Sequence, residues 1–202
     1  PPQSWADLRQ SGILDPRTND AIFRSKFFRP SANHTVPSIQ DVLAGRAKVE
    51  LDAGHLEEIM EEEVFDVYSF PLLSESFCGR VQAYLQRIMG ELDKVKDPNS
   101  IAVAGGRRVR NLDHLGLSWL NDLLFQLIVR PISRHLYQQT EMDSGDLDWR
   151  HGFLAAYSAD PNIHKPRQRL VPHTDDAEVT LNVCIGDVFE GGRLQFWGLR
   201  GT

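Results

Sequence analysis

Hydrophobic residues in the middle of the chain recur every three or four positions, which is the spacing of helices with one buried face. The first such stretch follows Ser74, a residue that can cap a helix N-terminus, and its apolar positions are Phe77, Val81, Tyr84, Leu85, Ile88 and Leu92. The second runs over 115–137, with apolar positions Leu117, Leu120, Leu123, Leu124, Leu127 and Ile128. Pro131 has no backbone N–H and is expected to break or kink this second helix. The pattern predicts two long helices, separated by a loop region at 97–106.

From Trp149 onward the hydrophobic period changes to two, which is typical of β-strands. We expect strands over 150–158, 167–173 and 178–185. In the last of these, one side carries Val179, Leu181, Val183 and Ile185, and the other carries Glu178, Thr180, Asn182 and Cys184. The polar side either lines a ligand site or is the solvent face of a half-buried strand.

The first 63 residues are mixed, with short apolar patches interrupted by Pro30 and Pro37. A helix is expected over about 52–62, and a short strand over 64–70 that Pro71 stops. Helical segments therefore precede a strand-rich C-terminal part, and the fold class is predicted to be α+β.

The composition is that of a globular chain of 202 residues, one domain or one domain with an appendage. A net charge of −6 without a basic stripe gives no support for a nucleic-acid partner, and no apolar run is long enough for a membrane span. We interpret the acidic residues in 57–63 as a solvated helix face rather than a docking site. Cys78 and Cys184 do not suggest a disulfide framework. The chain opens Pro1-Pro2 and is interpreted as a fragment, so the compartment stays open, with the cytoplasm slightly favoured.

His173 and Asp175 form the most informative pair of polar residues in the chain. Side chains two positions apart on an extended backbone project to the same side, so an imidazole nitrogen and a carboxylate oxygen can reach one ion. Two ligands of this kind are part of a 2-His-1-carboxylate iron site, which leaves coordination positions open. Asp176 would project to the opposite side of the extended chain, and we interpret it as a residue that supports the metal ligands or is solvated.

Two neighbouring motifs carry a family resemblance. The sequence His173-Thr-Asp-Asp-Ala-Glu-Val-Thr-Leu-Asn-Val183, followed by Phe189-Glu-Gly-Gly-Arg-Leu-Gln-Phe196, resembles the core of iron(II)- and 2-oxoglutarate-dependent dioxygenases. It is most similar to the prolyl-4-hydroxylase and lysyl-hydroxylase branch, which includes the 2-oxoglutarate and iron-dependent oxygenase domain-containing proteins. The resemblance covers about 149–196, and 64–78 is similar to the lead-in to the first long helix of these proteins.

The resemblance implies helices that brace a partial double-stranded β-helix, a jelly-roll or cupin-like fold. It divides the chain into an N-terminal mixed or helical extension, 1–63, and a prolyl-hydroxylase-like dioxygenase domain, 64–202, that is truncated before the distal histidine. We expect the chain alone to bind iron weakly or not at all, because two protein ligands rarely hold a redox metal against water.

The resemblance also implies an enzyme. It would be an Fe(II)- and 2-oxoglutarate-dependent dioxygenase, supported by ascorbate, that hydroxylates a peptide, protein or small-molecule substrate and releases succinate and carbon dioxide. His173 and Asp175 would be two of the three iron ligands, and the residues near 2-oxoglutarate would be Tyr157, Thr180, Cys184 and Leu194. Tyr157 fits a barrel-wall position equally well. Two rivals stay open: a catalytically inactive interaction module on the same scaffold, and a cupin-like metal enzyme that does not use 2-oxoglutarate.

Other residues near the motif receive no such role. His151 and His164 precede His173, whereas the resemblance implies a distal histidine well after it and then a basic residue for the cosubstrate, beyond Arg193 and Arg200. We interpret Gly191-Gly192 as a tight turn with positive φ, and Trp197 as a packing residue.

Overall fold

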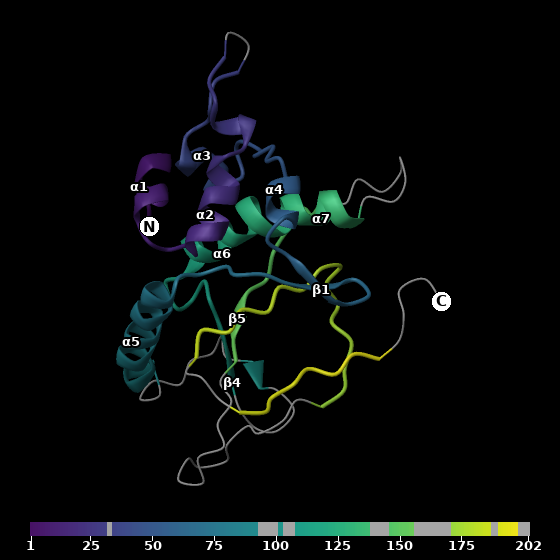
Figure 1. The fold of residues 1–202 in the computed structure, drawn as a ribbon. Coiled ribbons are helices and arrows are strands. Elements are labelled where there is room, and N and C mark those ends of the chain that lie inside the picture. The colour runs from purple at the N-terminus through teal and green to yellow at the C-terminus, as the bar shows by residue number, and fades with distance from the viewer. Residues whose placement is uncertain are drawn as a thin grey trace.

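The computed structural model describes residues 1–31, 34–92, 101–102, 108–137, 146–155, 171–186 and 190–197. The helices are α1 (Trp5–Gln10), α2 (Pro16–Phe23), the 3-10 helix η1 (Lys26–Phe28), α3 (Ile39–Leu43), α4 (Gly54–Glu57), α5 (Glu75–Leu92), α6 (Ser118–Leu124), the π-helix η2 (Phe125–Val129) and α7 (Arg130–Tyr137). The strands are β1 (Glu61–Val64), β2 (Val67–Ser69), β3 (Ile101–Ala102), β4 (Arg108–Asn111) and β5 (Phe153–Leu154). The short helices α1 to α4 gather around the α6–α7 helix, and the strands lie on its other side (Figure 1).

The short N-terminal helices begin at residues whose side chains satisfy free backbone donors. Ser4, Asp15 and Ser38 each accept a hydrogen bond from a backbone N–H in the first turn of α1, α2 and α3. These helices bury Leu8, Ile22 and similar residues against leucines of α6 and η2 in a single hydrophobic cluster. Residues before and after position 64 therefore share one core, while the domain boundary expected there stays a prediction.

The predicted helix over 52–62 is wrong in its extent. α4 ends at Glu57, and Glu61–Val64 instead forms β1, which pairs with β2 in an antiparallel hairpin. A helix through 57–62 would place like charges four residues apart, which is unfavourable. The single strand predicted over 64–70 is also wrong in its extent, because Val64 ends β1, Asp66 turns the chain at φ 62°, and only Val67–Ser69 forms β2. The acidic side chains of β1 are exposed, but on a hairpin rather than on a helix face.

The two long helical segments are confirmed. α5 begins at Glu75, and Ser74 caps it by accepting a hydrogen bond from the Phe77 N–H at 3.1 Å. The second segment runs as α6, η2 and α7 without leaving helical geometry, and its π-helical turn precedes Pro131. Pro131 has no N–H to donate to the carbonyl of Leu127. The helix continues, and its backbone hydrogen bonds change from the α-helical to the π-helical pattern just before Pro131.

A three-stranded antiparallel sheet has the order β3-β4-β5, with Asn111 opposite Phe153 and Arg110 opposite Leu154. The strand predicted over 150–158 is confirmed only at Phe153–Leu154, and 156–158 lie outside the described residues. Gly152 lies against α6, because a Cβ atom there would be 2.6 Å from the Asn121 amide. The opposite side of this strand is open, with Trp149 71% and Phe153 53% exposed.

The segment 171–186 bends at 176–179 and forms no ladder with the other described residues. Its predicted alternation is confirmed in burial: Val179, Leu181, Val183 and Ile185 are partly buried, while the residues between them are exposed. The described residues 171–173 of the strand expected over 167–173 form no strand, and 167–170 lie outside the description. The α+β class fits this arrangement. The double-stranded β-helix is not confirmed.

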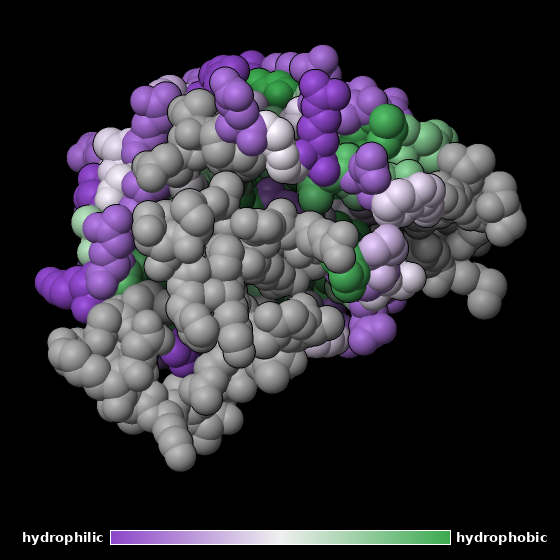
Figure 2. Space-filling view, turned by 90° about the horizontal axis from the view of Figure 1, so that it is seen from below, coloured by the Kyte–Doolittle hydropathy of each residue, from purple (hydrophilic) through white to green (hydrophobic). Residues whose placement is uncertain are grey.

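Viewed from below, the described surface is mostly hydrophilic, with hydrophobic side chains set among the charged ones (Figure 2). The large apolar residues of the C-terminal segments contribute to the exposed surface: Val171, Leu194, Phe196 and Trp197 are each at least half exposed. Trp197, 71% exposed, is therefore not a packing residue among the described residues, contrary to expectation. None of the helices described by the structure is both long and apolar enough to span a membrane.

Candidate metal centre

The extended backbone brings His173 and Asp175 together. His173 Nε2 lies 3.2 Å from Asp175 Oδ1, and both side chains are nearly half exposed, at 46% and 47%. The spacing of two residues along an extended chain is what turns both groups to one side. The pair is therefore open to a ligand from solvent.

The other nitrogen of His173 is also engaged. Nδ1 lies 2.9 Å from the backbone carbonyl oxygen of Val171. A carbonyl oxygen can only accept, so Nδ1 carries the hydrogen, and Nε2 of the neutral ring presents its lone pair. Histidine ligands of metal ions are held in the same way, with one ring N–H donated to a carbonyl or carboxylate.

Asp175 is fixed from its other side by Thr180. The Thr180 hydroxyl donates to Asp175 Oδ2 at 2.7 Å, while Oδ1 faces His173. The bend at 176–179 brings Thr180 back to the carboxylate. One carboxylate oxygen is thus occupied by a neutral donor and the second is directed at the imidazole.

This arrangement places two electron-pair donors face to face. A neutral His173 Nε2 and Asp175 Oδ1 would repel at 3.2 Å unless a positive charge lies between them or on the ring. That charge is either a proton, which makes an ion pair, or a metal ion. Two ligands about 2.1 Å from one ion and at right angles to each other are about 3 Å apart. The pair therefore fits part of the coordination shell of a divalent metal.

The remaining expected site residues are less well gathered. Cys184 and Leu194 are exposed, and no contact joins either of them to the His173–Asp175 pair among the described residues. Tyr157 lies outside the described residues. His151 stands between Trp149 and Phe153, with ring centroids 6.5 Å and 5.8 Å away. Gly191 and Gly192 have φ of 81° and 67°, as expected for the turn.

Within the described residues, no group of three His, Cys, Asp or Glu side chains could hold a metal ion. His173 and Asp175 thus supply two candidate ligands, with no third side chain of these types beside them in the part of the chain described. The further histidine that the resemblance implies stays a prediction.

The segment that leads into β5 is held by partly exposed ion pairs. Arg150 donates to Asp122 Oδ1 at 2.6 Å and to both oxygens of Asp113 at 2.9 and 3.0 Å. Burial opposes the charge of Arg150, but the two carboxylates outweigh it and raise the pKa of the guanidinium. These contacts fix 150–154 against the start of α6.

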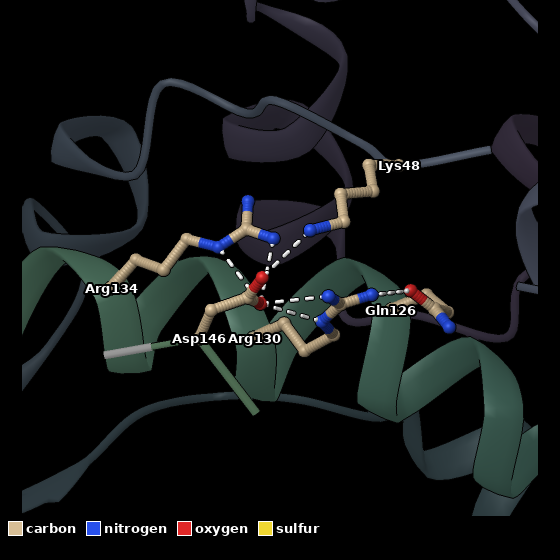
Figure 3. Close-up of polar contacts among 5 residues, drawn as sticks. All are labelled: Lys48, Gln126, Arg130, Arg134 and Asp146. Atoms are coloured by element: carbon tan, nitrogen blue, oxygen red, sulfur yellow. Dashed lines mark hydrogen bonds and ion pairs between the residues drawn. The ribbon is translucent and has the colours of Figure 1, made fainter. Parts of the chain in front are cut away.

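A second charge cluster holds Asp146, which lies on the segment that leads into β5 (Figure 3). Asp146 Oδ1 accepts hydrogen bonds from Arg130 and Arg134 at 2.7 and 2.8 Å, and Oδ2 accepts one from Lys48 at 2.9 Å. Burial opposes the charge of Asp146, yet these three cations hold its pKa far below the usual value. We call these four residues the Asp146 cluster. It joins α7, the segment before α4 and the approach to β5.

The Asp146 cluster and the contacts of Val171 and Thr180 with the His173–Asp175 pair could not be predicted from the sequence. Arg130 and Arg134 share one face of α7, which is a usable signal for an anionic partner, but nothing in the sequence identifies Asp146 as that partner. The Val171 contact uses a backbone carbonyl, which leaves no trace in side-chain patterns. Thr180 was expected near a cosubstrate, and its contact is with Asp175.

Comparison with known proteins gives a consistent result. A 2-oxoglutarate and iron-dependent oxygenase domain-containing protein, CP2, of Arabidopsis thaliana is 35% identical over 146 residues, 70% of this chain and 34% of that protein. The human 2-oxoglutarate and iron-dependent oxygenase domain-containing protein 2 is 31% identical over 146 residues, 71% of this chain and 38% of that protein. The human multifunctional procollagen lysine hydroxylase and glycosyltransferase LH3 is 29% identical over 147 residues, 69% of this chain and 19% of that protein.

The chain spans about a third of the length of the first two relatives. No family model and no solved structure matches it. The matched relatives carry the same family name as the resemblance seen in the His173 motif. The chain belongs to the family of 2-oxoglutarate and iron-dependent oxygenases.

Proposed function

We propose that the protein is an Fe(II)- and 2-oxoglutarate-dependent dioxygenase that hydroxylates a side chain of a peptide or protein and releases succinate and carbon dioxide. The observation that carries this proposal is the convergence of His173 Nε2 and Asp175 Oδ1 at 3.2 Å, with Nδ1 held by the Val171 carbonyl. Family membership supports iron and 2-oxoglutarate as the partners of this pair. The name of the lysine hydroxylase relative supports a peptide side chain as substrate.

His173 and Asp175 would hold the metal, and Thr180 would orient the carboxylate. His173 would bind through Nε2 and Asp175 through Oδ1, while the Thr180 hydroxyl keeps the carboxylate from rotating. The bound iron and its cosubstrate would supply the oxidising chemistry for an unactivated C–H bond. Cys184, Leu194 and Tyr157 remain proposed neighbours of 2-oxoglutarate, and ascorbate a proposed reductant that keeps the iron ferrous.

Succinate formation tests the proposal. The full-length protein is purified and incubated with Fe(II), ascorbate and 2-oxoglutarate, with and without a peptide mixture, and succinate is measured against time. We expect succinate in the wild type and a loss of at least about a hundredfold in His173→Ala and Asp175→Ala, because each removes a metal ligand. Asp176→Ala is the matched control, since Asp176 is an exposed neighbouring carboxylate. Equal succinate from all four proteins would contradict the proposal, and no succinate from any would favour the non-catalytic alternative.

A further inference from the structure

The two cysteines of the chain lie on segments that contact each other. Cys78 is half-buried in the first turn of α5, and Cys184 is exposed on the extended segment 178–185. Gln82 follows Cys78 by one helical turn on the same face of α5. Its side-chain N–H donates to the backbone carbonyl of Ile185, the residue after Cys184, at 2.6 Å. The C-terminal segment runs beside α5 at this point (Figure 1).

The two thiols differ in burial and in electrostatics. Burial raises the pKa of the Cys78 thiol, and the next largest cause is the charge of Cys184. A raised pKa lowers the fraction of Cys78 present as thiolate, so its attack should be the slower of two successive steps. Cys184 is the thiol that an oxidant in solution meets first, because it is exposed whereas Cys78 is half-buried.

We propose that Cys78 and Cys184 are a modification site, where a disulfide oxidant such as glutathione disulfide links them within one chain. In the first step the Cys184 thiolate attacks one sulfur of glutathione disulfide, the S–S bond breaks, and one glutathione thiolate leaves. In the second step the Cys78 thiolate attacks the Cys184 sulfur, and the second glutathione thiolate leaves. The two protein thiols lose two electrons and two protons, and glutathione disulfide is reduced to two glutathione thiols.

The link would fasten the segment of the candidate site to α5. Thr180, which donates to Asp175, lies four residues before Cys184 on the same exposed side of that segment. A covalent bond at Cys184 therefore fixes the register of the segment relative to the helix. The inference rests on thiol chemistry alone and does not depend on the proposed oxygenase activity.

The test is peptide mapping after oxidation. The protein is equilibrated with glutathione disulfide and about 0.1 mM glutathione, alkylated and digested without reduction. Attack by Cys78 within the chain has an effective concentration of about a millimolar or more, so the linked Cys78–Cys184 peptide should exceed the mixed disulfide at Cys184 by at least about tenfold. In Cys78→Ser the mixed disulfide at Cys184 should accumulate instead.

Three outcomes would overturn the inference. One is that wild type and Cys78→Ser accumulate equal mixed disulfide at Cys184. Another is that mixed disulfides form at both cysteines of the wild type without a linked peptide. The third is a linkage that rises with protein concentration, which would place it between chains. If Cys78→Ser does not fold, the proposal is tested by the peptide map of the wild type and by whether the yield of linked peptide depends on protein concentration.

Discussion

The Thr180 hydroxyl donates to Asp175 Oδ2 at 2.7 Å, so a residue five positions later on the bent chain holds the carboxylate of the candidate metal centre. The second oxygen of Asp175 is then directed at His173. A carboxylate held in this way loses little rotational freedom when a cation binds. Orienting contacts of this kind are what make two exposed side chains a preorganised pair.

Thr180→Val should weaken divalent metal binding without removing it. The substitution keeps the shape of the side chain and removes the donor to Asp175, and such supporting contacts change metal affinity by about 10- to 100-fold. Isothermal titration of the full-length protein with Mn(II) would measure the change, expected here near the lower end because the site is half exposed. Thr180→Ser, which keeps the hydroxyl, should restore most of the affinity; equal affinities for all three proteins would show that the hydrogen bond is irrelevant.

Asp146→Asn should destabilise the fold. It leaves Lys48, Arg130 and Arg134 facing each other without the carboxylate, and Arg130 is only 11% exposed. Removing one partner of a buried ion pair costs about 3–5 kcal/mol, and partial exposure of the cluster reduces this to about 2–3 kcal/mol. Urea unfolding would measure the loss. Asp148→Asn, at an exposed carboxylate two residues on, should stay within about 0.5 kcal/mol of the wild type.

The same cluster should make stability depend on acid pH. The pKa of Asp146 is depressed in the folded chain, so its contribution is present above the unfolded value of about 3.9 and is lost as the pH falls through the folded value. Lowering the pH from 6 to 3 should therefore cost the wild type about 1 kcal/mol more than it costs Asp146→Asn. Parallel stability curves for the two proteins from pH 6 to 3 would contradict this assignment.

Two glycine substitutions should act in opposite directions. Gly152→Ala places a Cβ atom 2.6 Å from the amide of Asn121, which is buried and bonded to Asp113, so it should cost about 1–3 kcal/mol. Gly79→Ala adds a methyl group to an exposed position of α5 with nothing within 4 Å, so it should gain about 0.5–1 kcal/mol. Thermal unfolding of both variants is the measurement; a neutral Gly152→Ala would mean that β5 is not held against α6 as described.

The helices could be predicted from the sequence because each has a local signal. α5 has a capping Ser74 and a continuous apolar face. The segment from α6 to α7 has a leucine stripe, and Pro131 predicts an irregularity there. The irregularity is a π-helical turn rather than a break. The β1–β2 hairpin could not be predicted with the same rules, because five acidic residues around 57–63 carry no periodicity that separates a helix from a strand. Its turn depends on a positive φ at Asp66, which few patterns specify.

The contact between His173 and Asp175 could be predicted because it is local, while their role as metal ligands stays a prediction. His173 and Asp175 are two residues apart, so strand parity alone brings them together. Contacts that join distant segments, such as Gln82 with Ile185 or Lys48 with Asp146, depend on how whole elements pack. No spacing rule within one segment contains that information. The alternation of apolar and polar residues over 178–185 is visible in the sequence. The sequence does not show whether the polar side lines a ligand site or faces solvent.

The most direct test of the metal centre is a titration of the full-length protein with Mn(II), followed by the electron paramagnetic resonance signal of the free ion. One equivalent should bind to the wild type and to Asp176→Ala, while His173→Ala and Asp175→Ala should each bind at least about tenfold more weakly. If both alanine variants bind Mn(II) as tightly as the wild type, His173 and Asp175 do not hold the metal.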